Sequence, residues 1–290
     1  MDAAPNQVFF PSNLQELFSA WSRFPDAVPY AGGTGIIRDQ EKRVPVLPRN
    51  IIALDNLEDL RRITRTERYL EIGAAVRLSE ILNLGKIVPE ILTKTLEGIA
   101  GPALRNLATI GGNICYRPSR LDTSAPLAAL DAHYELRTAD SARWISASRF
   151  SSLPGPPALE PQELLTRIRI PLEQWNYSIY RKFTSPGNNE AGKVIVFILK
   201  NQKNILTDLR VVYSGTIILQ DRNSETLLIG KRLPLEKKEA QNFLENWKHY
   251  LQAMANAALK QRNAPGKPQI DLLKAQILNF ISNIITGIAD

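Results

Sequence analysis

The sequence predicts an α+β fold in which a larger mixed domain is followed by a smaller domain of sheet and helices. Short apolar runs of strand length alternate with short helix patterns as far as Pro171. Two longer apolar runs joined by a polar turn come next, and two long helix patterns come last. With 290 residues the chain is long enough for two cores. We therefore expect a first domain over residues 1–172 and a C-terminal domain, an antiparallel sheet with helices, over residues 176–290.

The expected elements of the first domain follow from apolar spacing and from residues that begin or end helices. Ser12-Asn13-Leu14-Gln15 has the spacing of a capping box and begins a helix. Apolar runs of strand length lie at residues 27–31, 51–54, 69–75, 132–138 and 164–170. Short helices are expected at residues 55–62, from Ser79 onward and at residues 89–100, with a further turn through Leu104 and Leu107.

The second domain is expected after a boundary at residues 171–176, where Pro171 stops the preceding strand pattern. Residues 194–200 and 208–219 have the pattern of strands, and the polar residues 201–204 form the turn between them. Helices are expected at residues 236–261 and 269–287, the second with one broad apolar face. This order predicts a small sheet covered by helices.

Composition narrows the class of protein. Hydrophobic residues make up 44% and charged residues 22%, as in ordinary globular proteins. No apolar stretch approaches the ~20 residues that span a bilayer, and Met1-Asp2-Ala3-Ala4-Pro5 lacks the features of a secretion signal. Cys115, the single cysteine, excludes an internal disulfide and a cluster held by cysteines of this chain alone. His133 and His249 are the two histidines, too few for a histidine-based metal site, so we expect no metal of this chain's own. Taken together, these features predict a cytoplasmic protein with no membrane contact.

The formal charge of +7 favours anionic partners in general. The basic residues are scattered, however, and no dense basic run is interleaved with aromatic residues. Solvated helix faces account for most of them. We therefore expect no nucleic-acid partner.

Two glycine-rich stretches carry the strongest functional signal: Ala31-Gly32-Gly33-Thr34-Gly35 and Thr109-Ile110-Gly111-Gly112-Asn113. Each follows an apolar run. Backbone without Cβ atoms can turn with positive φ and approach a ligand closely, and successive N–H groups in such turns attract anions such as a diphosphate. Each Gly-Gly pair alone is more often a tight turn. Two such stretches in one domain favour a long ligand with a diphosphate in its middle, that is, a dinucleotide.

Two better-known nucleotide motifs are excluded. Arg38 stands where the third glycine of G-x-G-x-x-G belongs, and the polar residues 39–43 follow where a helix should begin. Residues 187–193 match G-x-x-x-x-G-K, but Val194 replaces the required Ser or Thr and begins a strand pattern. Neither a Rossmann fingerprint nor a P-loop is predicted, and residues 187–193 are expected to form a hairpin loop.

The segments read together resemble the FAD-binding medium subunits of molybdenum hydroxylases of the carbon monoxide and xanthine dehydrogenase type. The resemblance extends over nearly the whole chain. It is carried by residues 28–34, by residues 72–81, by Ala108-Thr109-Ile110-Gly111-Gly112-Asn113-Ile114 with Asp122 nine residues after Asn113, by Tyr180-Arg181-Lys182-Phe183, and by Gly230-Lys231-Arg232-Leu233-Pro234.

The resemblance implies a fold and a set of site residues. The fold would be a vanillyl-alcohol-oxidase-type (PCMH-type) FAD-binding domain of two α/β subdomains, followed by the smaller C-terminal domain. The first glycine stretch and the residue after it would cradle the FAD diphosphate; these residues are Ala31, Gly32, Gly33, Thr34, Gly35 and Ile36. The second stretch would hold the diphosphate and ribityl side with Thr109, Gly111, Gly112 and Asn113.

Two charged residues complete the site that the resemblance implies. Asp122 would accept hydrogen bonds from cofactor hydroxyls. Lys182, or its neighbour Arg181, would lie near the isoalloxazine and favour the reduced, anionic flavin. No catalytic nucleophile or acid–base pair is expected from this chain, because the flavin carries the redox chemistry.

The function implied is an electron-transfer subunit of a heteromeric enzyme. A molybdopterin-binding large subunit would oxidise the substrate, an iron–sulfur small subunit would relay electrons to FAD, and NAD or another acceptor would receive them. A flavin-free scaffold or assembly subunit is the alternative, because Gly35 stands where many relatives have Asp and residues 116–121 are bulky and basic. A self-contained flavin oxidase is less favoured, since no active-site base or flavin-linking histidine is evident.

Overall fold

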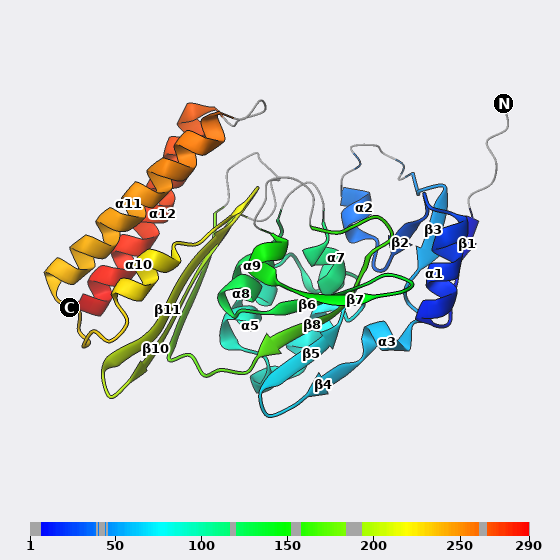
Figure 1. The fold of residues 1–290 in the computed structure, drawn as a ribbon, viewed down its shortest axis with the longest axis horizontal. Helices are drawn as coiled ribbons and strands as arrows, with labels where there is room; N and C mark the ends of the chain where they lie inside the picture. Colours follow the sequence, from blue (N-terminus) through cyan, green and yellow to red (C-terminus); the bar gives the residue numbers. More distant parts are fainter. Residues whose placement is uncertain are drawn as a thin grey trace. The chain divides into compact units, whose positions relative to one another are not determined.

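A computed structural model of the chain describes residues 7–38, 40, 44, 46–116, 120–151, 158–183, 193–260 and 266–289. These residues form a mixed α/β structure with three separate sheets and several helices (Figure 1). The chain divides into two compact units. The first comprises Met1–Glu173, Tyr180–Val194 and Ser214–Ile218, and the second comprises Gln174–Ile179, Ile195–Tyr213 and Leu219–Asp290.

The first sheet is small and parallel. Its strands are β1 (Gln7–Phe9), β2 (Val28–Tyr30) and β3 (Asn50–Ala53), in the order β1-β3-β2. Helix α1 (Leu14–Arg23) buries Leu17, Phe18 and Trp21 in a core that also contains Ile52 and Leu57. Strand β2 leads directly into the first glycine stretch and the short helix α2 (Thr34–Arg38). This sheet therefore positions the first glycine stretch at the end of a strand.

Helix α1 begins one residue later than the sequence predicts. Asn13 is the N-cap, and its side chain accepts from the Glu16 N–H at 2.9 Å. The Ser12 N–H and hydroxyl instead donate to the Glu16 carboxylate, at 2.9 and 2.8 Å. The capping box predicted from Ser12 and Gln15 is therefore wrong by one residue. Asn13 is the cap, and its partner is Glu16.

The second sheet is antiparallel and has five strands in the order β4-β5-β8-β6-β7. They are β4 (Ile63–Arg65), β5 (Tyr69–Gly73), β6 (His133–Arg137), β7 (Ala142–Ser146) and β8 (Leu164–Pro171). One face buries alternate apolar residues: Leu70, Ile72, Tyr134, Leu136, Ile168 and Ile170. This alternation is the pattern of a sheet packed on one side.

Short helices belong to the same unit. They are α3 (Glu58–Arg61), α4 (Leu78–Leu82), the 3-10 turn η1 (Gly85–Ile87), α5 (Glu90–Glu97), α6 (Pro102–Arg105), α7 (Ile110–Ile114), α8 (Ser124–Ala129) and α9 (Ala147–Phe150). All six residues of α8 are buried. Two of these helices adjoin the predicted motifs: Thr109 of the second glycine stretch caps α7, and α8 begins two residues after Asp122.

The third sheet has the order β12-β11-β10-β9, with β9 (Tyr177–Lys182), β10 (Val194–Gln202), β11 (Ile205–Ser214) and β12 (Ile218–Leu219). Lys203 and Asn204, with φ of 49° and 61°, form a two-residue hairpin turn where the sequence predicts a polar turn. The predicted strand 208–219 begins earlier, at Ile205, and is interrupted between β11 and β12. Helices α10 (Arg222–Leu227), α11 (Lys237–Leu259) and α12 (Lys267–Ala289) follow, and α11 and α12 pack side by side (Figure 1).

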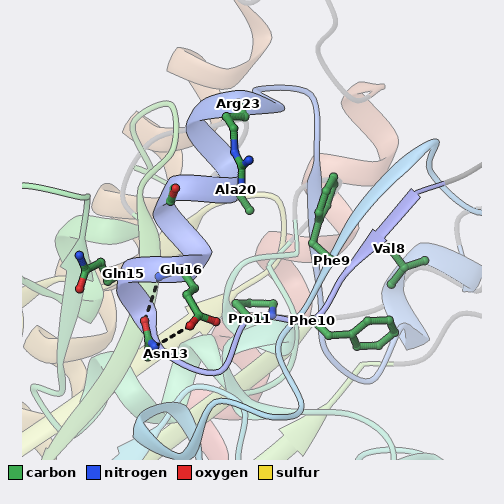
Figure 2. Close-up of a pocket in the computed structure, with 10 residues that line it drawn as sticks. Val8, Phe9, Phe10, Pro11, Asn13, Gln15, Glu16, Ala20 and Arg23 are labelled. Carbon is green, nitrogen blue, oxygen red and sulfur yellow. Dashed lines mark hydrogen bonds between the residues drawn. The ribbon is translucent and has the colours of Figure 1, made fainter.

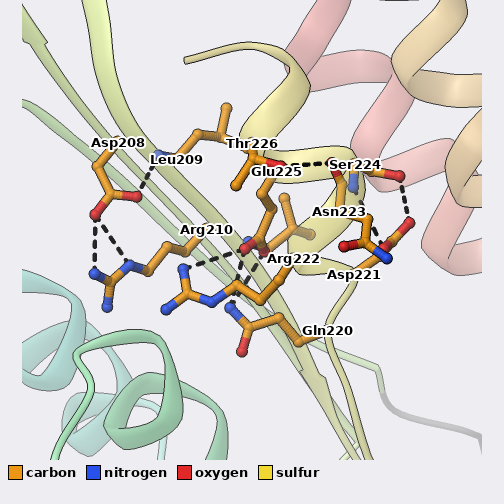
Figure 3. A network of polar contacts seen from close by, with 11 residues as sticks. Asp208, Leu209, Arg210, Gln220, Asp221, Arg222, Asn223, Ser224, Glu225 and Thr226 are labelled. Atoms are coloured by element: carbon orange, nitrogen blue, oxygen red, sulfur yellow. Dashed lines mark hydrogen bonds and ion pairs between the residues drawn. The ribbon is translucent and has the colours of Figure 1, made fainter.

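A polar network joins β11 to α10 in the second unit (Figure 3). The buried Glu225 carboxylate accepts from the Val211 N–H at 2.7 Å and from Gln220 Nε2 at 3.1 Å. Arg222 lies 3.3 Å from the same carboxylate. Burial raises the pKa of Glu225 to about 7, although these donors act in the opposite direction.

Four strands and five α-helices were not predicted from the sequence; the helices are α2, α7, α8, α9 and α10. Strands β1, β4, β7 and β9 are short or lie at sheet edges, so their residues show no clear alternation. Helix α2 begins at Thr34, within the first glycine stretch, whereas the sequence predicts a polar loop after Arg38. Of the described residues, no helix is both long and apolar enough to cross a bilayer. The predicted hairpin loop at residues 187–193 lies, except for Lys193, outside the described residues.

Candidate functional site

The first glycine stretch presents a row of unused amide groups. Gly33 has φ of +67°, and its carbonyl accepts from the Ile37 N–H at 3.1 Å to begin α2. The N–H groups of residues 32–36 donate to no protein acceptor in the described part of the chain, and all five residues are half-buried. The first-turn amides of a helix point toward its N-terminal end. The stretch can therefore cradle an anion with main-chain donors.

The two glycine stretches lie against each other. A methyl group on Gly32 would overlap the carbonyl group of Leu107, just before the second stretch. A methyl group on Gly35 would lie 3.1 Å from the Tyr116 ring, just after it. The Arg38 guanidinium lies 6.0 Å from the centre of the same ring. The structure thus brings together the two stretches that the sequence predicts to form one site.

The second stretch differs from the prediction in how its amides are used. The Gly111 N–H donates to Ala74 O at 2.8 Å, and the Asn113 N–H donates to Thr109 O at 3.0 Å. The Gly112 N–H donates to the Thr109 hydroxyl at 3.1 Å. Gly111 also packs so closely on Ala74 that a methyl group there would lie 2.7 Å from Ala74 Cβ. These amides hold α7 in place, so the second stretch offers side chains to a ligand.

Asn113 is the side chain of this stretch that is fixed for binding. Its Oδ1 accepts from the Thr123 hydroxyl at 2.6 Å and from the Thr123 N–H at 3.4 Å. Both residues are buried. Among the described residues, nothing accepts from Asn113 Nδ2. The anchored amide therefore has one donor group left for a ligand.

Asp122 and Lys182 form an ion pair although they are distant in the sequence. Lys182 Nζ lies 2.8 Å from Asp122 Oδ1, and the Asp122 side chain is buried. The Tyr180 hydroxyl donates to the same oxygen at 3.5 Å. Burial, and then the charge of Asp122, raise the pKa of Tyr180. No described group donates to Asp122 Oδ2, which leaves an acceptor for a hydroxyl-bearing ligand.

The basic stretch before Asp122 is partly packed into the protein. Arg120 is 2% exposed, its Nε donates to Ser151 O at 3.4 Å, and its N–H donates to Gly215 O at 2.9 Å. Burial lowers its pKa. Residues 117–119 lie outside the described residues.

A surface pocket of about 640 Å³ lies elsewhere, beside β1 and α1 (Figure 2). Val8, Phe9 and Phe10 form its apolar side, and Glu16 and Arg23 are among its polar residues. None of the described residues that line it belongs to the predicted site. The glycine stretches have unused amide donors and pack closely, two chemical features that the pocket lacks.

A match to a known protein family shows the class to which this chain belongs. Residues 4–173 match the family described as the FAD binding domain in molybdopterin dehydrogenase. The chain belongs to this family. FAD is the cofactor of these domains. The predicted resemblance is therefore confirmed, and the chemistry of the site fits this cofactor: unused amides for a diphosphate, an amide donor at Asn113 and a carboxylate oxygen at Asp122.

Similar proteins include an oxidase and proteins named as a subunit or a medium chain. The FAD-binding family member described here is 31% identical to aldehyde oxidase 1 of Bos taurus over 242 residues, 76% of this chain and 18% of that enzyme. It is 31% identical to the xanthine dehydrogenase FAD-binding subunit of Escherichia coli O157:H7 over 150 residues, 51% of each chain. It is 26% identical to the glyceraldehyde dehydrogenase medium chain of Sulfolobus acidocaldarius over 225 residues, 76% of this chain and 80% of that one. The chain thus spans about a fifth to a half of the first two relatives.

A solved structure shares the fold of this family member. Quinoline 2-oxidoreductase from Pseudomonas putida 86 has a chain that matches with a TM-score of 0.79 and 21% identity. The match covers 100% of this chain and 98% of that chain. At this identity the likeness shows the fold alone.

Sequence reasoning missed several residues that organise the site. Thr123 anchors Asn113, Tyr180 binds Asp122, and Tyr116 packs on Gly35. Tyr180 stood in a recognised motif but was not assigned to the site. Sequence signals existed for Tyr180 and for Tyr116, which begins the bulky stretch 116–121, whereas the contact of Thr123 with Asn113 depends on tertiary packing.

Proposed function

We propose that this chain is the FAD-carrying electron-transfer subunit of a heteromeric, molybdopterin-dependent hydroxylase or dehydrogenase of the xanthine or carbon monoxide dehydrogenase kind. Membership of the family supports FAD, and the relatives named as an FAD-binding subunit and a medium chain support the subunit role. Bound FAD would take electrons from an iron–sulfur small subunit, which serves a molybdopterin-binding large subunit, and pass them to NAD or another acceptor. A cytoplasmic location is part of this proposal.

The finer architecture is also proposed. Residues 1–172 would form the PCMH-type FAD-binding domain with two α/β subdomains, and residues 176–290 the C-terminal domain. Support comes from the parallel sheet β1-β3-β2 and the antiparallel sheet β4-β5-β8-β6-β7, each with its own apolar side. Each sheet would be the centre of one subdomain.

The observation that carries the proposal is the row of unused amides at residues 32–36, packed against both ends of the second glycine stretch. In the proposal, residues from Ala31 to Ile36 hold the diphosphate, and Thr109 and residues 111–113 close the cradle from the other side. Asp122 accepts from cofactor hydroxyls through Oδ2. Lys182 supplies positive charge near the cofactor.

Titration of the purified chain with FAD tests this proposal. We expect a flavin absorption spectrum on the purified protein, and quenching of flavin fluorescence as FAD is added to apoprotein. Excess ADP should compete, because it shares the diphosphate. Gly32→Ala should weaken binding about tenfold or more, since the methyl group must displace the Leu107 carbonyl. Gly101→Ala is the matched control, because nothing lies within 4 Å of the position of its Cβ.

A flavin-free scaffold or assembly subunit is the second candidate. The packing of the Tyr116 ring on Gly35 favours it, because this ring takes space beside the first glycine stretch. The purified protein would then be colourless and bind no FAD in the titration, yet form a stable complex with the molybdopterin-binding subunit. This result would establish the scaffold role and refute the FAD-carrying role.

A further inference from the structure

We infer that Tyr180 is a positioning residue: held against Gly98, it fixes which oxygen of the Asp122 carboxylate remains open for the cofactor. The inference rests on the proposed function, because it concerns the same site. Asp122, Tyr180, Lys182 and Gly98 all belong to the first compact unit.

Both protein donors reach the same carboxylate oxygen. Lys182 Nζ lies 2.8 Å and the Tyr180 hydroxyl 3.5 Å from Asp122 Oδ1, while Oδ2 has no donor among the described residues. A carboxylate can exchange its two oxygens by rotating about its last side-chain bond. Donors on one oxygen oppose that rotation. They leave Oδ2 as the acceptor that a ligand hydroxyl meets.

The two donors differ in how firmly they hold this orientation. The lysine ammonium is a point charge on a flexible stem and can follow either oxygen. The phenol hydroxyl is fixed to a rigid ring, so its position is set by where the ring lies. Of the two, Tyr180 is therefore the donor whose direction is fixed by its own side chain, and it adds to the shorter contact from Lys182.

Gly98 shows why the ring lies where it does. This residue ends α5 with φ of −75° and ψ of −7°, a conformation open to any residue. Its lack of a side chain is therefore not required by the backbone. A methyl group there would lie 2.7 Å from both Cε1 and Oη of Tyr180. The absence of Cβ lets the tyrosine ring approach the end of α5 closely enough to reach Asp122.

The tyrosine keeps its donor proton at neutral and moderately alkaline pH. Burial raises the pKa of Tyr180, and the negative charge of Asp122 raises it further. The hydroxyl therefore donates to the carboxylate across the pH range in which the protein would work.

The test measures FAD affinity, flavin absorption and thermal unfolding of apoprotein for Tyr180→Phe, Gly98→Ala and Tyr177→Phe. Tyr180→Phe keeps the ring and removes the hydroxyl. We expect it to raise the Kd for FAD about tenfold and to shift the bound-flavin spectrum, with an almost unchanged apoprotein midpoint. Gly98→Ala should raise the Kd similarly by displacing the ring. Tyr177→Phe, on the same strand and 46% exposed, should bind like wild type.

A double variant separates positioning from simple packing. If Tyr180 acts through Asp122, adding Tyr180→Phe to Asp122→Asn should weaken binding no further than Asp122→Asn alone. Additive losses would overturn the inference, as would wild-type affinity in Tyr180→Phe while the wild-type protein binds FAD. Failure of the wild-type protein to bind FAD would instead overturn the proposed function, and the inference with it.

Discussion

Thr123 donates its hydroxyl to Asn113 Oδ1 over 2.6 Å, and both side chains are buried. This bond fixes the direction of the Asn113 amide and leaves Nδ2 without an acceptor among the described residues. We predict that Thr123→Val weakens FAD binding about five- to tenfold, because the amide loses its anchor and can turn.

Fluorescence titration with FAD checks this effect. Thr123→Ser keeps the hydroxyl and should retain most of the affinity. Thr95→Val is a matched control, since Thr95 is also buried and its hydroxyl donates to Ile91 O at 2.8 Å, within α5. Equal losses in Thr123→Val and Thr95→Val would show that the effect is one of general stability.

Gly111 should tolerate no larger residue, because of packing rather than ligand binding. Its Cα faces Ala74, where a methyl group would lie 2.7 Å from both Cβ and O. We predict that Gly111→Ala lowers the free energy of unfolding by about 1–3 kcal/mol. Gly287→Ala is the contrasting control: it lies in α12 with nothing within 4 Å, so alanine should be neutral or slightly stabilising. Urea unfolding of apoprotein measures both, and an unchanged Gly111→Ala would contradict the packing argument.

Tyr134 carries a hydroxyl for which the described residues provide no partner. The residue is fully buried, with its ring edge-on to Phe150 at 5.2 Å between centres. We predict that Tyr134→Phe raises the free energy of unfolding by about 1 kcal/mol, since it removes an unsatisfied polar group and keeps the ring. Chemical denaturation checks the sign. A clear loss of stability would mean that a water molecule satisfies the hydroxyl.

Glu225 should make stability depend on pH. Its pKa is raised to about 7 from an ordinary value of 4.5, so the folded protein binds more protons than the unfolded chain between these values. Its contribution is therefore fully present below about pH 4.5 and is lost as pH rises through 7. The total is on the order of 3 kcal/mol.

Glu225→Gln removes this titration. We expect the wild type to lose unfolding free energy relative to Glu225→Gln as the pH rises from 5 to 8. Glu245→Gln, at an exposed site on α11, is the matched control because it makes the same substitution outside the buried network. If the wild type and Glu225→Gln differ in unfolding free energy by the same amount at pH 5 and pH 8, the raised pKa of Glu225 is refuted.

Sequence patterns identified the longer elements because those elements satisfy local rules. Residues 194–200 lie within β10, and residues 236–261 and 269–287 cover most of α11 and α12. Edge strands could not be predicted because their stability comes from pairing with a neighbouring strand. For example, β7 pairs with β6, and three of its five residues are exposed. Its sequence alone carries no alternation to detect.

The site was predictable in its residues but not in its contacts. The motifs pointed to Gly33, Asn113, Asp122 and Lys182, yet no local rule places Lys182 beside Asp122, because the two are brought together by tertiary packing. The sequence equally gave no sign that the amides of the second stretch are used within the fold. The bond from Gly111 depends on Ala74 lying next to α7 in space, whereas Thr109 is the N-cap of α7 and its bonds are local.

The row of amides at residues 32–36, which meets no acceptor among the described residues, belongs to the polypeptide backbone. Replacing the side chain of Thr34 or Ile36 leaves the donors in place, so substitutions at these two positions would underestimate the importance of this segment. Related proteins could diverge freely at Thr34 or Ile36 and still present the same donors. A one-residue insertion or deletion, by contrast, would displace every donor at once, and gaps rather than substitutions should be rare here among relatives that keep the cofactor.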